Sequence, residues 1–351
     1  MRKVNLLSVV VPCYQEEEIL PLTHARLTAV LKGFQEKKIC SHYELIYVDD
    51  GSQDNTLGIL KGLIEKDPCM RIVALRCNFG HQAAICAGLR YARGDAVVTI
   101  DADLQDPPEK IEEMINFYEE DYDLVLGVRQ DRSIDSFMKK VTAEAYYHLL
   151  KFMGVNIVHN HGDFRLMARP LVNEFNCLSE RNRFIRAMIL QLESRYGIVT
   201  YTREPRRKGK TKFTFRKMWH FSWDGIVSFS YVPLRLALVL GALMFVGSVI
   251  GIIWVFYSKI TQRVVHGWAS TILPIFAFGG FQLLVMGLIG EYIGRLYLEV
   301  KRRPLYVVRK EYRHESLLEE TDQTTDPSGF GPFDGPAKAD PLRGGPSMGK
   351  E

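Results

Sequence analysis

Apolar positions in the first part of the chain follow two alternating patterns, short β-branched runs and longer runs with helical spacing. The short runs predict strands at 7–11, 44–48, 70–75, 96–100 and 124–128. Helical spacing between them predicts helices at 21–33, around Leu57, Leu60 and Ile64, at 82–91, and after Pro108. Strands separated by helices indicate parallel βαβ crossovers with helices on both faces of the sheet. The expected fold class is therefore α/β with a mostly parallel sheet.

Beyond residue 133 the apolar pattern becomes less regular. It predicts an amphipathic helix near residues 137–152, a polar turn into a strand at 160–167, and a helix at 183–192. Asp163 and Arg165 are two residues apart in that strand, so we expect them on the same side. Three histidines in this region have a spacing that fits no standard metal site, and we interpret them as solvated loop residues: His148, His159 and His161.

Two long uncharged runs follow, at 236–257 and 268–290. At about 1.5 Å per residue, each can cross the ~30 Å core of a bilayer as a helix. The preceding stretch, 213–232, mixes aromatic rings with Lys and Arg, as helices that lie in the membrane interface do. Gly-x-x-x-Gly patterns at 247–251 and 290–294 favour close helix packing, so a homo-oligomer through these helices is an expected partner state.

The distribution of charge predicts the orientation of the hairpin. Basic residues flank both of its outer ends, whereas the loop at 258–267 carries only Lys259 and Arg263. We therefore expect an integral protein of the cytoplasmic membrane with both termini cytoplasmic. The expected parts are a catalytic domain (1–212), interfacial amphipathic helices (213–232), a transmembrane hairpin (233–296), a basic cytoplasmic flank (297–317) and a disordered tail (318–351).

Composition excludes some classes of function. The 351 residues are 47% hydrophobic and 25% charged, an ordinary globular average, and a net charge of +4 is too small to indicate nucleic-acid binding. All six cysteines precede residue 178 without a Cys-x-x-Cys pair. This pattern argues against a zinc site and a disulfide framework, and it favours reduced thiols.

Polar side chains follow several predicted strands at the point where each strand ends. Asp49 and Asp50 follow the second strand, and Asp101 and Asp103 follow the fourth. Ligands of open α/β sheets bind at this edge, and two carboxylates at such spacing can hold a divalent cation such as Mg²⁺. Acidic residues also dominate ordinary turns, which is the alternative for each acid taken singly. No G-x-G-x-x-G follows the first strand, which argues against a dinucleotide-binding fold.

The densest basic run lies at 203–212 and has two interpretations. It can be a polybasic patch beside the membrane, attracted to anionic lipid. It can also be a clamp on phosphate groups. Both hold if the substrate is itself an anionic lipid.

Four segments together carry a resemblance to a known family: VVVPCYQEEE, VDDGSQDNT, IDADLQDPP and GDFRLM. They resemble the family 2 inverting glycosyltransferases with a GT-A fold. More narrowly, they are similar to membrane-anchored polyprenyl-phosphate glycosyltransferases, above all bactoprenol glucosyltransferases and more distantly dolichol-phosphate mannose synthases. The resemblance covers about residues 5–300. The sequence departs from the family at Gln15, where Asn is common, and at His161, where Thr is common.

The resemblance implies a role for each matching residue. It implies that the nucleoside of a nucleotide sugar is surrounded by Pro12, Tyr14, Glu16, Val48 and Asp50. It implies that Asp101, Ala102 and Asp103 meet the metal and the diphosphate, with Gln105 helping to hold the metal. Arg129 would lie beside the sugar or acceptor, Arg206 and Lys212 would hold phosphate, and Asp163 and Arg165 would act at the acceptor side.

The implied reaction transfers one sugar, with glucose from UDP-glucose our preferred choice, to a polyprenyl phosphate, with Mg²⁺ or Mn²⁺ as cofactor. Two alternatives remain open. A processive polysaccharide synthase usually carries Gln-x-x-Arg-Trp, and the nearest text here is QLESRY at 191–196, one residue longer and without Trp. A non-catalytic membrane scaffold could bind nucleotide sugar, but it would not need both metal carboxylates.

Overall fold

The computed structural model describes residues 2–130, 158, 160–178, 180, 185–193, 195–202, 268–301 and 303–314, with scattered residues between 234 and 257. The predicted helix near 137–152, the basic run with Arg206 and Lys212, the interfacial helices and the tail lie outside the described residues. So do His148 and His159.

The described chain forms a mixed eight-stranded sheet in the order β7-β5-β6-β4-β1-β2-β3-β8. The strands are β1 (Val4–Cys13), β2 (Cys40–Asp49), β3 (Met70–Leu75), β4 (Ala96–Thr99), β5 (Leu124–Arg129), β6 (His161–Ala168), β7 (Tyr196–Tyr201) and β8 (Val308–Arg313). Strands β6 and β8 run antiparallel to their neighbours, and the other pairings are parallel. The predicted α/β class with a mostly parallel sheet is confirmed.

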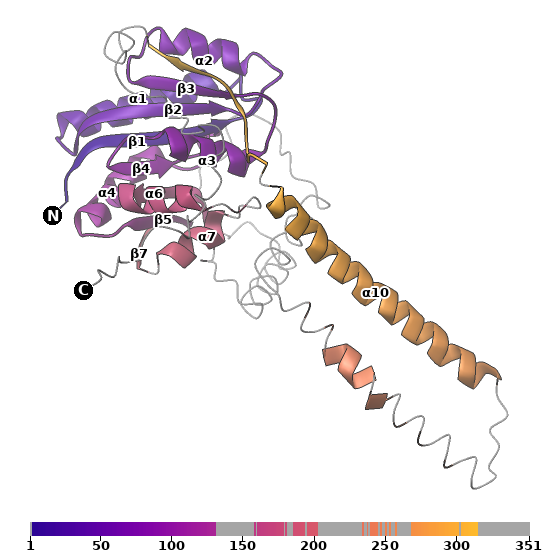
Figure 1. Ribbon diagram of the computed structural model, residues 1–351. Coiled ribbons are helices and arrows are strands. Elements are labelled where there is room, and N and C mark those ends of the chain that lie inside the picture. Colours follow the sequence, from indigo (N-terminus) through magenta and orange to yellow (C-terminus); the bar gives the residue numbers. More distant parts are fainter. Residues whose placement is uncertain are drawn as a thin grey trace, which may run out of the picture.

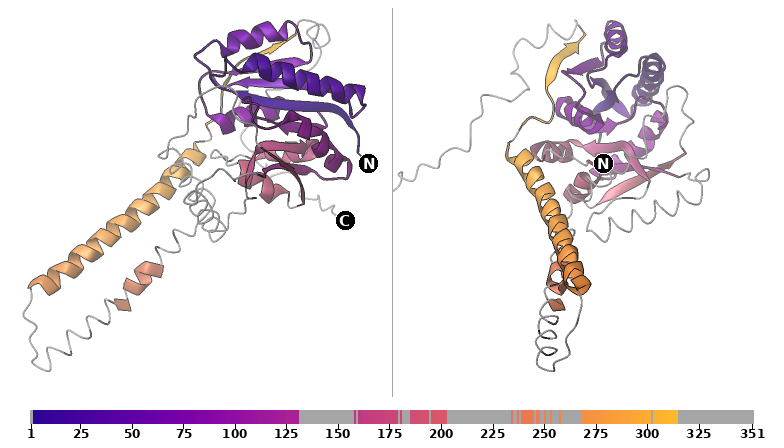
Figure 2. Two further views of the ribbon diagram at one scale, coloured as in Figure 1. Left: turned by 180° about the vertical axis from the view of Figure 1, so that it is seen from behind. Right: turned by 90° about the vertical axis from the view of Figure 1, so that its right-hand side faces the viewer.

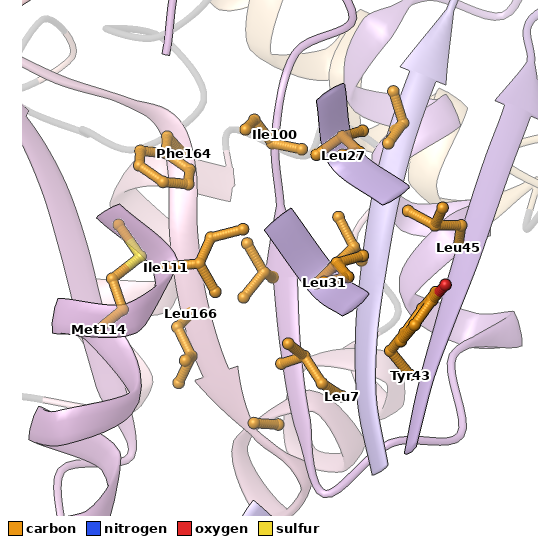
Figure 3. Packing of buried hydrophobic residues seen from close by; sticks show 14 of the residues in the cluster. Leu7, Leu27, Leu31, Tyr43, Leu45, Ile100, Ile111, Met114, Phe164 and Leu166 are labelled. Carbon is orange, nitrogen blue, oxygen red and sulfur yellow. The ribbon is translucent and has the colours of Figure 1, made fainter. Parts of the chain in front are cut away.

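Helices cover both faces of the sheet, as Figures 1 and 2 show from opposite sides. One face carries α1 (Leu20–Glu36), α2 (Thr56–Ile64) and α4 (Ile111–Glu119), with the 3₁₀ turn η1 (Pro108–Lys110) before α4. The other face carries α3 (His81–Tyr91), α6 (Arg169–Cys177) and α7 (Ile185–Leu192). Each face buries its own apolar cluster, and Figure 3 shows the first.

The central strand β1 shows why the apolar runs are unbroken. Leu7, Val9 and Val11 point into the cluster under α1, while Val10 points into the cluster under α3. Successive strand residues face opposite sides of a sheet, so a strand covered on both faces is apolar at nearly every position, and the buried Ser8 of β1 is hydrogen-bonded to Glu44. This requirement explains why continuous β-branched runs located the inner strands correctly.

Strand β8 is an element that the sequence did not predict. It pairs antiparallel with β3, from Arg71 opposite Arg313 to Leu75 opposite Val308. Its sequence, VRKEYR, has no apolar run and was interpreted only as part of a basic flank. Figure 2 shows the chain returning after α10 to the edge of the sheet.

Helix α10 (Trp268–Val300) has 33 residues and projects away from the sheet (Figure 1). Within the part of the chain that the structure describes, no helix has the combined length and apolarity of a membrane span.

Candidate active site

The acidic segment after β4 is held at the carboxyl end of the strand. The carbonyl oxygen of Ala102 accepts a hydrogen bond of 2.6 Å from the hydroxyl of Thr23 on α1. Oδ1 of Asp103 accepts one of 3.1 Å from the backbone N–H of Gln105. The side chain of Asp101 is 26% exposed, so it is open to a ligand.

The backbone of this segment contains one uncommon conformation. Leu104 is buried and has φ of 56°, in the left-handed region that side chains other than glycine rarely adopt. Such a conformation costs on the order of 1–3 kcal/mol, and strained residues of this kind cluster at functional sites. Here the turn lies between Asp103 and Gln105, both expected at a metal.

Asp163, on β6, is the centre of a buried ionic cluster. Arg186 of α7 lies with Nη2 3.0 Å from Oδ2, and Arg165 donates from Nη2 to Oδ1. His81, the first residue of α3, lies with Nε2 3.2 Å from Oδ2 of Asp163 and 3.5 Å from Oδ1 of Asp101. The cluster therefore connects Asp163 of β6 to Asp101 in the acidic segment after β4 through one imidazole ring.

The two carboxylates that His81 connects have opposite pKa shifts. Burial alone would raise the pKa of Asp163, but Arg186, His81 and Arg165 together hold it well below its usual range. Burial raises the pKa of Asp101 to about 6, and Asp163 adds to the increase while His81 opposes it. Asp163 is thus a firmly ionised carboxylate, and Asp101 lies where negative charge is crowded.

A second polar group lies at the carboxyl end of β5. The hydroxyl of Tyr201 donates to Oδ1 of Asp106 at 2.6 Å, and Nε of Arg129 donates to that hydroxyl at 3.2 Å. The guanidinium of Arg129 also lies against Gly162, where a Cβ would be only 3.0 Å from Nη2. A larger residue at position 162 would therefore crowd the guanidinium of Arg129.

The residues expected at the nucleoside lie at the ends of β1 and β2. Pro12 and Val48 are paired neighbours with buried side chains, while Tyr14 and Glu16 are half-buried. The carboxylate of Asp50 accepts hydrogen bonds from the backbone N–H groups of Phe79, at 2.7 Å, and Gly80, at 2.9 Å. Asp50 thus fixes the entrance to α3, and with it the place of His81.

A metal site fits this arrangement only if substrate oxygens complete it. Among the described residues, no group of three or more His, Cys, Asp or Glu side chains is placed as a metal centre. Magnesium needs only one or two protein carboxylates when phosphates and waters fill its other positions. Burial first, and then the neighbouring carboxylates, raise the pKa of Asp101. A divalent cation would favour the ionised form, so Asp101, Asp103 and Gln105 fit such an ion.

The sequence missed three members of the site, namely His81, Arg186 and Tyr201. His81 follows Gly80, whose φ of 99° marks the sharp turn into α3, and that glycine was the available signal. Arg186 and Tyr201 lie in elements that the sequence did not connect to the strand ends. The interpretation of His161 as a solvated residue was wrong, because it is the first residue of β6 and is buried.

Comparison with known proteins shows the family of this chain. Residues 8–175 match the family described as Glycosyl transferase family 2, and residues 232–296 match the one described as GtrB C-terminal hairpin. The glycosyltransferase YkcC of Bacillus subtilis is 43% identical over 90% of this chain and 97% of its own. The glycosyltransferase sll0501 of Synechocystis is 42% identical over 86% and 94%. The bactoprenol glucosyl transferase of Shigella phage SfII is 39% identical over 88% and 98%.

The protein is therefore a glycosyltransferase. It belongs to glycosyltransferase family 2, with a sheet of the GT-A type and a C-terminal hairpin segment like that of the GtrB proteins.

Proposed function

We propose that this protein transfers a single glucose from UDP-glucose to a polyprenyl phosphate at the cytoplasmic face of the membrane, with inversion at the anomeric carbon. One observation carries the proposal. The match to bactoprenol glucosyl transferases extends over nearly their whole length and includes the hairpin as well as the catalytic domain. A match to the catalytic domain alone would not indicate which acceptor the enzyme uses.

At the donor side, Asp101 and Asp103 would hold Mg²⁺ or Mn²⁺ together with the diphosphate. A bound cation there would offset the charge that grows on the departing diphosphate. Arg129, whose side chain reaches the site from β5, adds positive charge beside the sugar. Arg206 and Lys212 are proposed as further phosphate contacts from the basic run.

At the acceptor side, Asp163 orients Arg186 and His81 and does not take a proton. A phosphate monoester has a second pKa near 6 and is largely an anionic nucleophile at neutral pH. Deprotonation therefore has little barrier to remove, and the depressed pKa of Asp163 makes it a weak base. Arg186, which is partly exposed, is placed to pair with the incoming phosphate while Asp163 fixes its guanidinium.

The hairpin at 233–296 is proposed to lie in the membrane and present the lipid acceptor. Large apolar side chains are exposed along α10, among them Leu283 at 72% and Met286 at 67%. Exposed apolar surface on this scale is typical of membrane or protein contact. The uncharged runs and the basic flanks support a crossing with both termini cytoplasmic.

The processive alternative is disfavoured by the place of Arg195. Its guanidinium lies 4.5 Å from the ring centroid of Tyr122, near the amino end of β5. The acidic cluster lies at the carboxyl ends of the parallel strands β4 and β5. Arg195 therefore lies at the amino ends of these parallel strands, away from the acidic cluster.

The test is turnover by the purified protein in detergent or vesicles. UDP-glucose, UDP-galactose, UDP-N-acetylglucosamine and GDP-mannose are each supplied with undecaprenyl phosphate, and the lipid product is read by mass spectrometry. The proposal predicts one hexose per lipid, preferentially from UDP-glucose. A ladder of successive hexoses would favour the processive synthase, and absence of any product with intact binding would favour the scaffold.

A further inference from the structure

His161 is buried without hydrogen-bond partners. The residue is only 4% exposed, and no group in the described part of the chain bonds to its Nδ1 or Nε2. A buried polar atom without a partner costs free energy comparable to a lost hydrogen bond, so native structures rarely leave both nitrogens of one ring in this condition. This arrangement suggests a site that a ligand completes.

Arg165, on the same strand, also has a buried nitrogen without a hydrogen-bond partner in the described part of the chain. It is fully buried, and its Nη2 reaches back along β6 to Gly162 O at 3.4 Å, next to His161. Its Nη1 has no hydrogen-bond partner among the described residues. Three unpaired nitrogens on one strand thus lie beside Asp163, at the edge of the sheet that receives the substrate.

The charges around His161 indicate which kind of ligand its ring can bind. Burial, and then Arg165 and Arg186, hold the pKa of His161 well below its usual range, so the ring is neutral. A neutral imidazole has one donor and one acceptor, whereas a phosphate dianion offers only acceptors. A sugar hydroxyl both donates and accepts, and neighbouring hydroxyls can satisfy both ring nitrogens and the spare Arg165 N–H.

We propose that His161 and Arg165 form a hydroxyl-binding subsite that holds the sugar during transfer, an inference that rests on the proposed function. The subsite lies on the strand face that also carries Asp163.

The kinetic test uses His161→Phe, which keeps a ring but offers no hydrogen bonds. With UDP-glucose we expect kcat/KM to fall about tenfold, while the thermal midpoint stays equal or rises because the phenyl ring needs no partner. The 2-, 3-, 4- and 6-deoxy analogues of UDP-glucose identify the contact. For the wild type, kcat/KM with one analogue should be about tenfold lower than with UDP-glucose. For His161→Phe, kcat/KM with that same analogue should be less than twofold lower than with UDP-glucose. Equal sensitivity of both proteins to every analogue would overturn the subsite.

Two further variants test whether the effect comes from lost hydrogen bonds at His161 and not from replacing any buried histidine. His161→Gln keeps a donor and an acceptor and should recover part of the lost kcat/KM. His24→Phe is the matched control, because His24 is a buried histidine that contacts Tyr47 at 3.3 Å and lies on the opposite face of the sheet. It should leave the analogue profile unchanged. If His161→Phe fails to fold, His161→Leu, which also offers no hydrogen bonds, decides, and a wild-type analogue profile together with full kcat/KM for that variant would overturn the proposal.

A binding experiment separates this inference from the proposed reaction. The ring ¹⁵N signals of His161, assigned with His161→Phe, should shift when UDP-glucose is added and stay in place with UDP. This result supports the subsite even if no lipid product forms. Signals that respond to undecaprenyl phosphate alone, or to no sugar nucleotide in the panel, would overturn it.

Discussion

Arg186 contacts both carboxylate oxygens of Asp163, with Nη2 3.0 Å from Oδ2 and Nε 3.3 Å from Oδ1. A side-on pair of this kind fixes the plane of both groups. It connects α7 to β6 and keeps Asp163 ionised across the pH range in which the enzyme would work. An ionised, fully engaged carboxylate is suited to positioning other groups.

Asp163→Asn should lower turnover strongly without making the residual activity steeply dependent on pH. The carboxamide cannot hold Arg186 and His81 as the carboxylate does, so we expect a loss of about 10²–10³ in kcat. Between pH 7 and 9 the residual rate should stay nearly flat. Strong recovery at high pH would make Asp163 the general base.

The same variant should also be less stable, because Arg165 is fully buried and Asp163 is one of its partners. Removing one partner of a buried ion pair costs about 3–5 kcal/mol. Since the pKa of Asp163 is depressed by folding, its stabilising contribution is present above about pH 4 and is lost at lower pH. Activity must therefore be measured well below the thermal midpoint of the variant. Arg186→Gln, which leaves the pair with Arg165 intact, should show the turnover defect with a smaller loss of stability.

Asp103→Asn should reduce transfer by about 10²–10³, because it removes one of the two carboxylates proposed to hold a cation. A chelator should abolish wild-type activity, and Mg²⁺ or Mn²⁺ should restore it. Asp121→Asn is the control, since Asp121 is an exposed acid paired with Arg2. Metal-independent turnover, or equal rates for the two variants, would contradict the assignment.

Sequence reasoning succeeded where one local pattern determines the outcome. Continuous apolar runs located β1 to β5, and Asp101 lies just beyond the carboxyl end of β4, where the sequence predicted a ligand site. It failed where the partner is distant in sequence. His81 reaches Asp163 across 82 positions, and β8 pairs with β3 across more than 200. Nothing in VRKEYR itself indicates that pairing.

Gln15 shows how the structure explains a departure from the family. It has φ of 53°, in the left-handed region, and its backbone N–H donates to Ser52 Oγ at 3.0 Å. Asn is several-fold enriched in this conformation. The Asn that the resemblance leads us to expect at this position would suit the same backbone geometry.

The proposed topology predicts that residue 262 faces the outside of the cell. A single cysteine introduced as Gln262→Cys should react with a membrane-impermeant maleimide in intact cells. Cys77 and Cys177 are exposed in the catalytic domain and should be replaced by Ser in this background. The matched control keeps Cys77, has Cys177 replaced by Ser, and carries Gln262 unchanged. It should react with the maleimide only after the cells are permeabilised. Labelling of residue 262 solely from the cytoplasmic side would contradict the topology.

Glu311 holds β8 to the sheet through a buried ionic network. Its Oε1 lies 2.6 Å from Nη2 of Arg71, which is 4% exposed and also pairs with Glu44 at 2.8 Å. Arg313 contacts the same carboxylate at 2.8 Å. Burial alone would raise the pKa of Glu311, but Arg313 and Arg71 lower it below its ordinary value. The charged carboxylate is therefore the form that stabilises the docked strand.

Glu311→Gln should lower the free energy of unfolding at pH 7 by about 1.5–3 kcal/mol, the range for hydrogen bonds to charged groups. A depressed pKa contributes stability above the unfolded value of about 4.3 and loses it as the pH falls through the folded value. The difference between wild type and variant should thus shrink below about pH 4. Glu112→Gln is the control, because its pair with Lys37 is exposed on both sides and should change stability by less than about 0.5 kcal/mol. Urea unfolding of the full-length protein, followed by far-ultraviolet circular dichroism at several pH values, measures both. Equal effects of the two variants, or a difference that persists unchanged at low pH, would show that β8 is not held by the charge on Glu311.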